Sequence, residues 1–232
     1  MGKLQFVTTA DGSKTLLHPT TGEHYHSMNG AVGESQHVFL ESGLKFFLRH
    51  HPVNPVTILE VGFGTGLNFL LSAQFCQDER LGLQYTGIES NPLSPEIVGQ
   101  SGYDEYVSKK TWDLFISGYE PAMQREMRFP NNILLEVVLQ NASGYNSAKR
   151  FDILYFDAFS AGSQPEMWTE QMLSQVCRHL KVGGLFVTYA MNGNLKRNIK
   201  ALGFSPEKIP GASGKREMLR ATKMDSHSPW NR

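Results

Sequence analysis

A glycine-rich turn, set between an apolar run and an amphipathic segment, constrains the fold of this chain more than any other feature. The apolar, partly β-branched run over residues 57–61 carries an acid, Glu60, and glycine then occupies every second position from 62 to 66. An amphipathic segment opens at Leu67. This order predicts a strand, a tight turn and a helix. Because glycine lacks a Cβ, a ligand can lie against bare backbone at the helix N-terminus, and we expect a nucleoside-type cofactor there.

The spacing of the glycines indicates which of two classes of cofactor the turn would bind, a dinucleotide or S-adenosylmethionine. The dinucleotide fingerprint is G-x-G-x-x-G, but Leu67 occupies its last position here. The pattern present, acid-x-G-x-G-x-G, resembles the first motif of class I S-adenosylmethionine (SAM) methyltransferases. The resemblance implies that Glu60 contacts the methionine end of SAM, often through water, and that Gly62, Gly64 and Gly66 admit it. A strand-to-helix turn without a ligand is the alternative, and a second acid downstream disfavours it.

That second acid closes the next predicted strand, over residues 83–89. Glu89 lies 23 positions beyond Gly66, about where this architecture places the carboxylate that accepts both ribose hydroxyls. An acid on the protein surface is the alternative. A third strand, over 133–139, is followed by Asn141 and Ala142. Class I methyltransferases commonly have an Asp in this turn that accepts from the adenine amino group, and the Asn141 carbonyl can accept the same bond.

A fourth predicted strand, over residues 151–157, ends in Asp157. Its acid end projects into the crevice at the carboxyl edge of the sheet, where ligands and chemistry collect in open α/β folds. Asp157 is therefore the predicted catalytic residue. The residues predicted to bind SAM are Glu60, Gly62, Gly64, Gly66, Asn68, Glu89, Asn141 and Ala142.

The alternation of strand and helix patterns predicts an α/β fold of the class I methyltransferase (Rossmann-like) type. Its sheet is expected to have seven mostly parallel strands and to close with an antiparallel C-terminal hairpin over 204–209 and 216–222. Residues 95–130 are expected to be irregular helix, and further helices are expected over 165–180, before a strand at 185–190, and over 193–201.

Three regions are expected along the chain. Residues 1–55 would form an N-terminal extension with a β-hairpin or short strands and a helix, because turn signals alternate there with short apolar stretches. Residues 56–224 would form the SAM-dependent methyltransferase domain. Residues 225–232 would be a flexible tail.

Composition excludes several classes of protein. Of the 232 residues 40% are hydrophobic, yet no apolar run approaches the roughly 18 residues of a membrane helix, and the N-terminus has no signal-peptide core. A cytoplasmic protein is expected. Cys76 and Cys177 form no C-x-x-C pair, and His24 and His26 have no evident third ligand, so neither a disulfide framework nor a metal site is predicted.

Charge is uneven along the chain although the net charge is zero. Residues 178–232 hold 11 Lys and Arg against Glu207, Glu217 and Asp225, which gives this segment a net charge of +8. Such a segment can face an anionic partner or can simply be a solvated basic surface. Both interpretations stay open on charge alone.

A more specific resemblance is carried by residues 34–39 and 62–69, by residues 155–160 with 165–169 (containing Pro-Glu-Met-Trp), and by residues 210–211 with 214–219 (containing Lys-Arg-Glu-Met-Leu). They are similar to the methyltransferase domain of the MnmC family, and the similarity covers nearly the whole chain. That family completes the 5-methylaminomethyl group on the wobble uridine (position 34) of certain bacterial tRNAs. One departure is Met191, where the family often has a Lys after the fifth strand, so we assign no substrate role to that turn.

The resemblance implies SAM-dependent N-methylation of a 5-aminomethyl group on tRNA, giving 5-methylaminomethyl-(2-thio)uridine. It implies that Asp157 orients the amine or accepts its proton, without a metal. Lys215 and Arg216 follow a glycine turn and are predicted to reach tRNA phosphates. The family domain is often fused to a flavin oxidase, and the length of this chain leads us to expect the free-standing form.

Two other classes compete with this hypothesis. An aminopropyltransferase of the polyamine type shares the fold and an aspartate after the fourth strand, but the basic C-terminal segment argues against a polycationic substrate. A non-catalytic SAM-binding or RNA-binding module is the other alternative. The presence of Asp157 together with the glycine turn disfavours it mildly.

Overall fold

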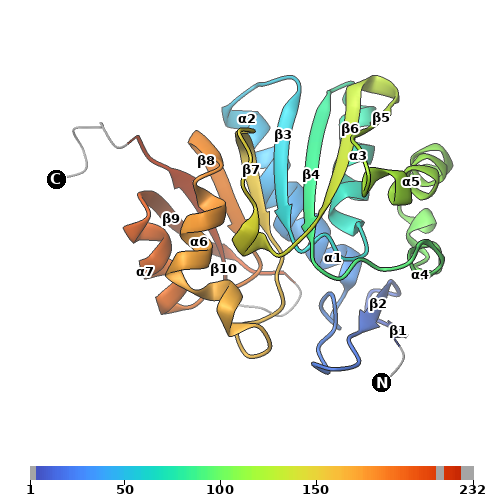
Figure 1. Cartoon of the computed structure of the whole chain (residues 1–232), viewed down its shortest axis with the longest axis horizontal. Coiled ribbons are helices and arrows are strands. Elements are labelled where there is room, and N and C mark those ends of the chain that lie inside the picture. The colour runs from blue at the N-terminus through green and yellow to red at the C-terminus, as the bar shows by residue number, and fades with distance from the viewer. Residues whose placement is uncertain (1–3, 213–216, 226–232) are drawn as a thin grey trace.

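A twisted eight-stranded sheet forms the centre of the molecule in the computed structural model, which describes residues 4–212 and 217–225 (Figure 1). The five strands from β6 to β8 are parallel, and β10 and β9 form an antiparallel hairpin next to β8. The α/β class and the closing hairpin predicted from sequence are confirmed. In their order across the sheet the strands are β5 (Met127–Phe129), β6 (Ile133–Leu139), β4 (Leu83–Glu89), β3 (Val56–Val61), β7 (Phe151–Phe156), β8 (Leu180–Thr188), β10 (Glu217–Lys223) and β9 (Phe204–Pro210).

The eighth strand, β5, lies in a region for which the sequence predicted only helix. It pairs antiparallel with β6 through Phe129 and Ile133, across a turn formed by Pro130, Asn131 and Asn132. Both asparagines have positive φ, 61° and 56°, a conformation that asparagine tolerates better than most residues and that tight turns use. The remainder of the region is helical, as α4 (Pro95–Gly99) and α5 (Lys109–Ala122).

Helices cover both faces of the sheet, which is why the central strands are buried on both sides. In Figure 1, α6 (Glu170–Cys177) and α7 (Gly193–Ala201) lie in front of the sheet, and the N-terminal helical segments lie behind it. Two hydrophobic clusters result, one on each face. Within the described ranges, none of these helices is long and apolar enough to span a membrane.

Two boundaries differ from the sequence prediction around α6 and β8. The expected helix over 165–180 is a 3₁₀ turn (Pro165–Trp168) followed by α6, because the Thr169 hydroxyl accepts the Met172 N–H at 3.2 Å and begins a new helix. The strand β8 begins at Leu180 instead of residue 185. Its pairing with β7 shifts register between Phe151 and Ile153, and Gly183 has a φ of 76°, so a bulge lies inside the strand where a turn was predicted.

The N-terminal region packs onto the same core as the sheet. It contains the expected hairpin of β1 (Gln5–Thr8) and β2 (Lys14–Leu17), followed by α1 (Ala31–Ser35), a π-helical segment η1 (Gln36–Lys45) and α2 (Phe46–His50). The helix α3 (Leu67–Asp78) belongs to the sheet domain. Gly43 lies against the Tyr155 ring, where a Cβ would approach Cε1 to 3.0 Å. Phe39 packs against the same ring in a tilted arrangement, with centroids 5.0 Å apart.

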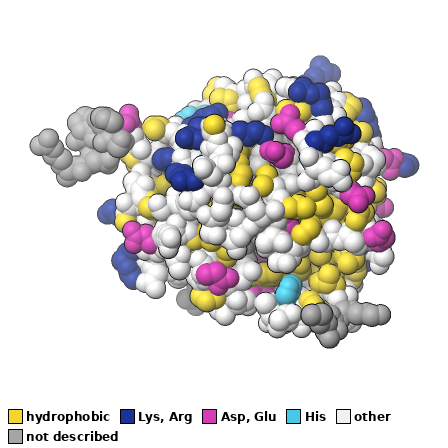
Figure 2. Space-filling model, in the orientation of Figure 1, with side chains coloured by type: hydrophobic (Ala, Val, Ile, Leu, Met, Phe, Trp, Pro, Cys, Tyr) yellow, Lys and Arg dark blue, Asp and Glu magenta, His cyan; other side chains and the backbone are white. Residues whose placement is uncertain are grey.

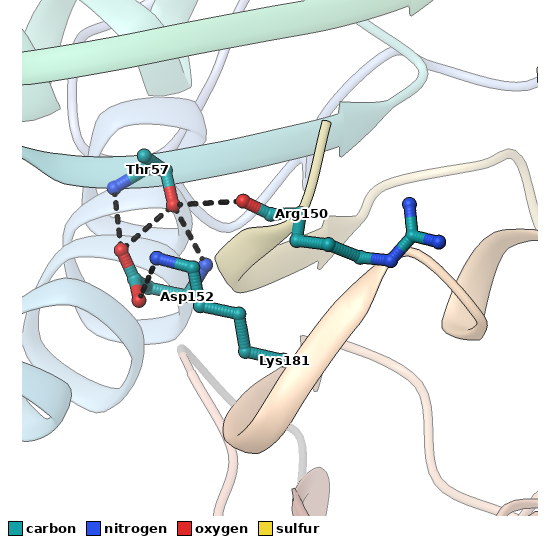
Figure 3. Close-up of polar contacts among 4 residues, drawn as sticks. All are labelled: Thr57, Arg150, Asp152 and Lys181. Carbon is teal, nitrogen blue, oxygen red and sulfur yellow. Dashed lines mark hydrogen bonds and ion pairs between the residues drawn. The ribbon is translucent and has the colours of Figure 1, made fainter. Parts of the chain in front are cut away.

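A buried polar cluster ties three strands together at the amino ends of β3 and β7, away from the functional edge (Figure 3). The Asp152 carboxylate accepts the Thr57 N–H at 2.9 Å and the Thr57 hydroxyl at 2.7 Å, and it pairs with Lys181 Nζ at 2.7 Å. The Asp152 N–H in turn donates to the Thr57 hydroxyl at 2.9 Å. These contacts hold the starts of β3, β7 and β8 together.

Candidate functional site

A cavity of about 330 Å³ opens at the carboxyl edge of the parallel strands. Its volume lies within the range of about 300–1,000 Å³ that is usual for small-molecule sites. Its walls come from residues 18–28, Glu34 of α1, the glycine turn with the start of α3, the ends of β4 and β6, the segment after β7, and Tyr189 after β8. Of the predicted site residues, Gly62, Gly64, Asn68, Glu89, Asn141, Ala142 and Asp157 line it.

The three glycines of the turn serve different neighbours. At Gly62 (φ 87°) a Cβ would lie 2.4 Å from the Asp157 carbonyl oxygen, and at Gly66 (φ 77°) it would lie 2.5 Å from the Phe115 ring. Gly66 does not line the cavity. The close approach of protein atoms therefore requires glycine at these two positions, whereas Gly64 lies under the Tyr25 ring, on the cavity wall.

Glu89 anchors the glycine turn from the end of β4. One carboxylate oxygen accepts the Gly64 N–H at 2.9 Å, and the other accepts the Asn91 N–H at 2.8 Å. Burial, with the charge of Glu89 adding to it, raises the pKa of Tyr25 to about 12. Glu89 thus presents a fixed carboxylate to the cavity beside a neutral phenol.

Glu60 lies behind the cavity wall rather than in it. Its side chain is fully buried and accepts hydrogen bonds from Asn68 Nδ2 at 2.7 Å and from the Tyr85 hydroxyl at 2.8 Å. Burial first, and the charge of Asp157 second, raise the pKa of Glu60 well above its ordinary value. Glu60 is not among the residues that line the cavity, and its contact with the methionine end of SAM, which in this family often runs through water, stays a prediction.

Asp157 stands at the end of β7, directly across from the glycine turn. Its N–H donates to the Val61 carbonyl at 2.9 Å, and its Oδ2 accepts from Asn68 Nδ2 at 2.8 Å. The Tyr189 hydroxyl, which also lines the cavity, donates to the Ala158 carbonyl at 3.0 Å. Burial and the charge of Asp157 raise the pKa of Tyr189, so this phenol stays neutral beside the carboxylate.

The turn after β6 forms the opposite end of the cavity. Asn141 is exposed, and its Oδ1 accepts the Ser143 N–H at 2.9 Å, so the side chain caps a short 3₁₀ turn. Ala142 next to it is buried. Both residues line the cavity, and their contact with adenine remains a prediction.

The N-terminal segment 18–28 is the part of the site that sequence reasoning missed. Glu23 accepts hydrogen bonds from the Ser160 N–H at 3.0 Å and from its hydroxyl at 3.2 Å, which ties this segment to the loop after β7. The Tyr25 and Phe159 rings meet edge to face with centroids 5.2 Å apart. The sequence contained one indication, the resemblance of the nearby block 34–39 to a family motif. That resemblance did not show that residues 18–28 line the cavity.

The basic C-terminal segment is partly neutralised within the protein. Lys208 pairs with Glu217 at 2.9 Å, and Arg220 pairs with Glu207 at 2.7 Å. On the face shown in Figure 2, Lys and Arg side chains gather mainly over the upper half of the molecule. Lys215 and Arg216, predicted to contact tRNA, lie outside the described residues, as do residues 226–232 of the predicted tail.

Where the chain is described, no group of three His, Cys, Asp or Glu side chains is placed to hold a metal ion.

Comparison with known proteins places the chain among related sequences. A family model described as S-adenosyl-L-methionine-dependent methyltransferase matches residues 107–224, just over half of the chain. The "tRNA 5-methylaminomethyl-2-thiouridine biosynthesis bifunctional protein MnmC" of Campylobacter hominis is 31% identical over 212 residues, which are 89% of this chain and 31% of that protein. The protein of the same name from Leptospira borgpetersenii is 32% identical over 84% of this chain and 31% of its own length. The chain thus spans about a third of these relatives.

Solved structures show the same fold. The crystal structure of MNMC2 from Aquifex aeolicus matches with a TM-score of 0.77 and 26% identity, over 96% of this chain and 71% of that one. Magnesium protoporphyrin IX methyltransferase from Synechocystis, solved with bound SAM, matches with a TM-score of 0.52 and 14% identity, over 83% of this chain and 81% of that one. With the cavity at the carboxyl edge and the family match over residues 107–224, the chain belongs to the SAM-dependent methyltransferases, and SAM is its cofactor.

Proposed function

We propose that the chain methylates the amine of a 5-aminomethyl group on the wobble uridine of tRNA and produces 5-methylaminomethyl-(2-thio)uridine. The names of the MnmC relatives and the similarity to MNMC2 support this tRNA substrate. The observation that carries the proposal is the placement of Asp157. Its carboxylate lines the cavity, is held by Asn68 at 2.8 Å and lies across from the glycine turn.

The cavity suits SAM in shape and chemistry. The Gly64 backbone lies in its wall, and Glu89, whose carboxylate is fixed by two backbone N–H groups, is the acceptor for the ribose hydroxyls in this proposal. Asn141 and Ala142 stand at the end where the adenine would lie. When bound, SAM supplies an electrophilic methyl group on a sulfonium. Residues at the glycine turn, Glu89, Asn141 and Ala142 would hold it in the same cavity as Asp157.

The substrate amine must lose a proton before it can attack. An amine with a pKa near that of lysine, about 10.4, needs roughly 4 to 5 kcal/mol to be neutral at pH 7, at about 1.4 kcal/mol per pKa unit. Asp157 accepts a hydrogen bond from the amine and aims its lone pair at the methyl carbon. With SAM bound, the new N–C bond would replace the C–S bond, whose electron pair would stay on sulfur as a neutral thioether, and the product would leave as a methylammonium ion.

Alignment supplies most of the rate in this proposal. Holding a nucleophile and an electrophilic carbon in line contributes roughly 7 to 11 kcal/mol to lowering a barrier. The segment 18–28 and the loop after β7, joined through Glu23 and Ser160, close two sides of the space in which the amine would stand. A fixed wall of this kind restricts both reactants and limits access of water.

The test compares two modified tRNAs as methyl acceptors. The purified chain with SAM is expected to methylate tRNA carrying 5-aminomethyluridine, as measured by mass analysis of the digested nucleosides. It is expected to leave tRNA carrying 5-carboxymethylaminomethyluridine unchanged, because that group would bring a carboxylate against Asp157 in a dry crevice. Unmodified tRNA is the control. A protein that binds SAM and methylates neither tRNA would overturn the proposal.

A further inference from the structure

Asn68 is the centre of a buried hydrogen-bond network at the base of the cavity. Its amide nitrogen donates to Glu60 Oε1 at 2.7 Å and to Asp157 Oδ2 at 2.8 Å. Its amide oxygen accepts a hydrogen bond from the hydroxyl of Ser35. All the hydrogen-bonding directions of the amide except one lone pair are therefore used, and the side chain is 3% exposed.

The three partners allow only one orientation of this amide. A rotation by 180° would turn the carbonyl oxygen toward the Asp157 carboxylate and would lose the bond to its Oδ2. Hydrogen bonds to charged groups contribute more than neutral ones, and a buried acceptor without a donor is costly. The amide is consequently locked as long as its oxygen has a donor on the opposite side.

Ser35 is that donor, and it comes from outside the sheet domain. It is the last residue of α1, immediately before the π-helical segment η1, and it is 1% exposed. Water therefore has no access with which to replace its hydroxyl. The contact joins residues 33 positions apart in sequence and connects the N-terminal helical segment to the first turns of α3.

We infer that Ser35 is a positioning residue for the methyl transfer, because its hydroxyl fixes the Asn68 amide and the amide fixes the plane of the Asp157 carboxylate. This inference rests on the proposed function, since it takes Asp157 as the group that aims the substrate amine. Without the hydroxyl, the amide oxygen is left buried and unpaired. The amide then turns away from its two acids to find a donor, and the carboxylate loses its alignment.

The chain offers a matched control in Ser72. This serine lies on α3, is 1% exposed, and bonds to the Tyr155 hydroxyl at 3.4 Å, one helical turn beyond Asn68. Ser72→Ala removes a buried serine hydroxyl from the same core without touching Asn68. Any loss that is common to Ser35→Ala and Ser72→Ala reports packing, and any loss that is specific to Ser35→Ala reports positioning.

The kinetic test uses Ser35→Ala, Ser35→Thr and Ser72→Ala in the full chain, with 5-aminomethyluridine tRNA and SAM. We expect Ser35→Ala to lower kcat by about 10- to 100-fold, the scale of effect that small misplacements of reacting groups cause. Its SAM affinity and its KM for tRNA stay within about threefold of wild type. Ser35→Thr, which keeps a hydroxyl, recovers at least a third of the wild-type kcat, and Ser72→Ala stays close to wild type. Equal kcat values for Ser35→Ala and Ser72→Ala would overturn the inference.

A second measurement does not depend on catalysis. With ¹⁵N-labelled asparagine, the two side-chain protons of Asn68 are expected to exchange slowly with water in the wild type and in Ser72→Ala. They are expected to exchange at least tenfold faster in Ser35→Ala. Unchanged exchange would reject Ser35 as the residue that fixes the amide. If the wild-type chain methylates no tRNA, the proposed function fails, and this comparison still decides the role of Ser35.

Discussion

Replacement of Glu89 is the sharpest test of how this cavity holds SAM. The carboxylate accepts one backbone N–H on each oxygen, from Gly64 at 2.9 Å and from Asn91 at 2.8 Å. A second lone pair on each oxygen can accept a ribose hydroxyl. Glu89→Ala therefore removes two kinds of contact, one with the cofactor and one with the turn that borders it.

The magnitude follows from these contacts. Hydrogen bonds to a charged group contribute about 1.5 to 3 kcal/mol each, and the partial exposure of Glu89 places both ribose bonds at the lower end, so the loss of SAM binding energy is about 2 to 4 kcal/mol. This corresponds to a Kd that rises roughly 30- to 700-fold. The freed N–H groups of Gly64 and Asn91 lower the free energy of unfolding by about 1 kcal/mol, or a Tm by roughly 2 to 4 °C. The variant is thus expected to stay folded at 25 °C.

Calorimetry of SAM binding measures the first quantity, and thermal unfolding measures the second. Glu120→Ala, on the exposed face of α5, is the matched control and should leave SAM affinity unchanged. An S-adenosylhomocysteine analogue without the two ribose hydroxyls separates the contact with the cofactor from the contact with the turn. If Glu89 binds the two hydroxyls, the wild type should bind this analogue more weakly than S-adenosylhomocysteine itself, and Glu89→Ala should bind both with similar affinity. A folded Glu89→Ala protein that binds SAM within threefold of wild type would refute the assignment.

Three further outcomes are expected. Asp157→Ala should lower kcat by about 100-fold or more while SAM affinity stays near wild type, and a fully active variant would make the carboxylate structural only. Replacement of both Lys215 and Arg216 by Ala should weaken tRNA binding and reduce the slope of log affinity against log salt by about one unit per lost contact, whereas equal slopes would mean that neither reaches phosphate. Since the pKa of Glu60 is raised in the folded state, its contribution to the free energy of unfolding should fall as pH rises above about 4.5. Glu60→Gln should therefore become more stable relative to wild type between pH 5 and pH 7 in denaturant titrations. A stability difference between the two proteins that does not change with pH would show that Glu60 is ionised in the fold.

The acids at the strand ends could be placed from sequence because two general rules act together. Side chains alternate along a strand, and the carboxyl ends of parallel strands share one edge of the sheet. Glu89 and Asp157, each closing an apolar run, had to meet at that edge, and both line the cavity. The same alternation accounts for Glu60, which shares a face of β3 with buried Ile58 and therefore lies on the α3 side, under Asn68.

Other features depend on contacts that no local pattern carries. The short strand β5 exists because Asn131 and Asn132 adopt positive φ, and nothing in the preceding residues distinguishes it from the end of a helix. The glycine at position 66 looked like a cofactor contact, yet the Phe115 ring of α5 is what excludes a side chain there. Such requirements come from residues distant in sequence, so a motif can identify the right residues while leaving their neighbours unknown.

The N-terminal region shows why the site cannot be assigned to the sheet domain alone. Leu16, Val38 and Phe39 belong to the same hydrophobic cluster as Ile58 and Tyr155, so removal of the extension would expose the face of the sheet that carries α3. The polar contacts follow the same route, from the hydroxyl at position 35 through the Asn68 amide to the acid at the end of β7. Packing of the extension and alignment of the carboxylate therefore depend on each other, and a change in one is transmitted to the other through a single buried amide.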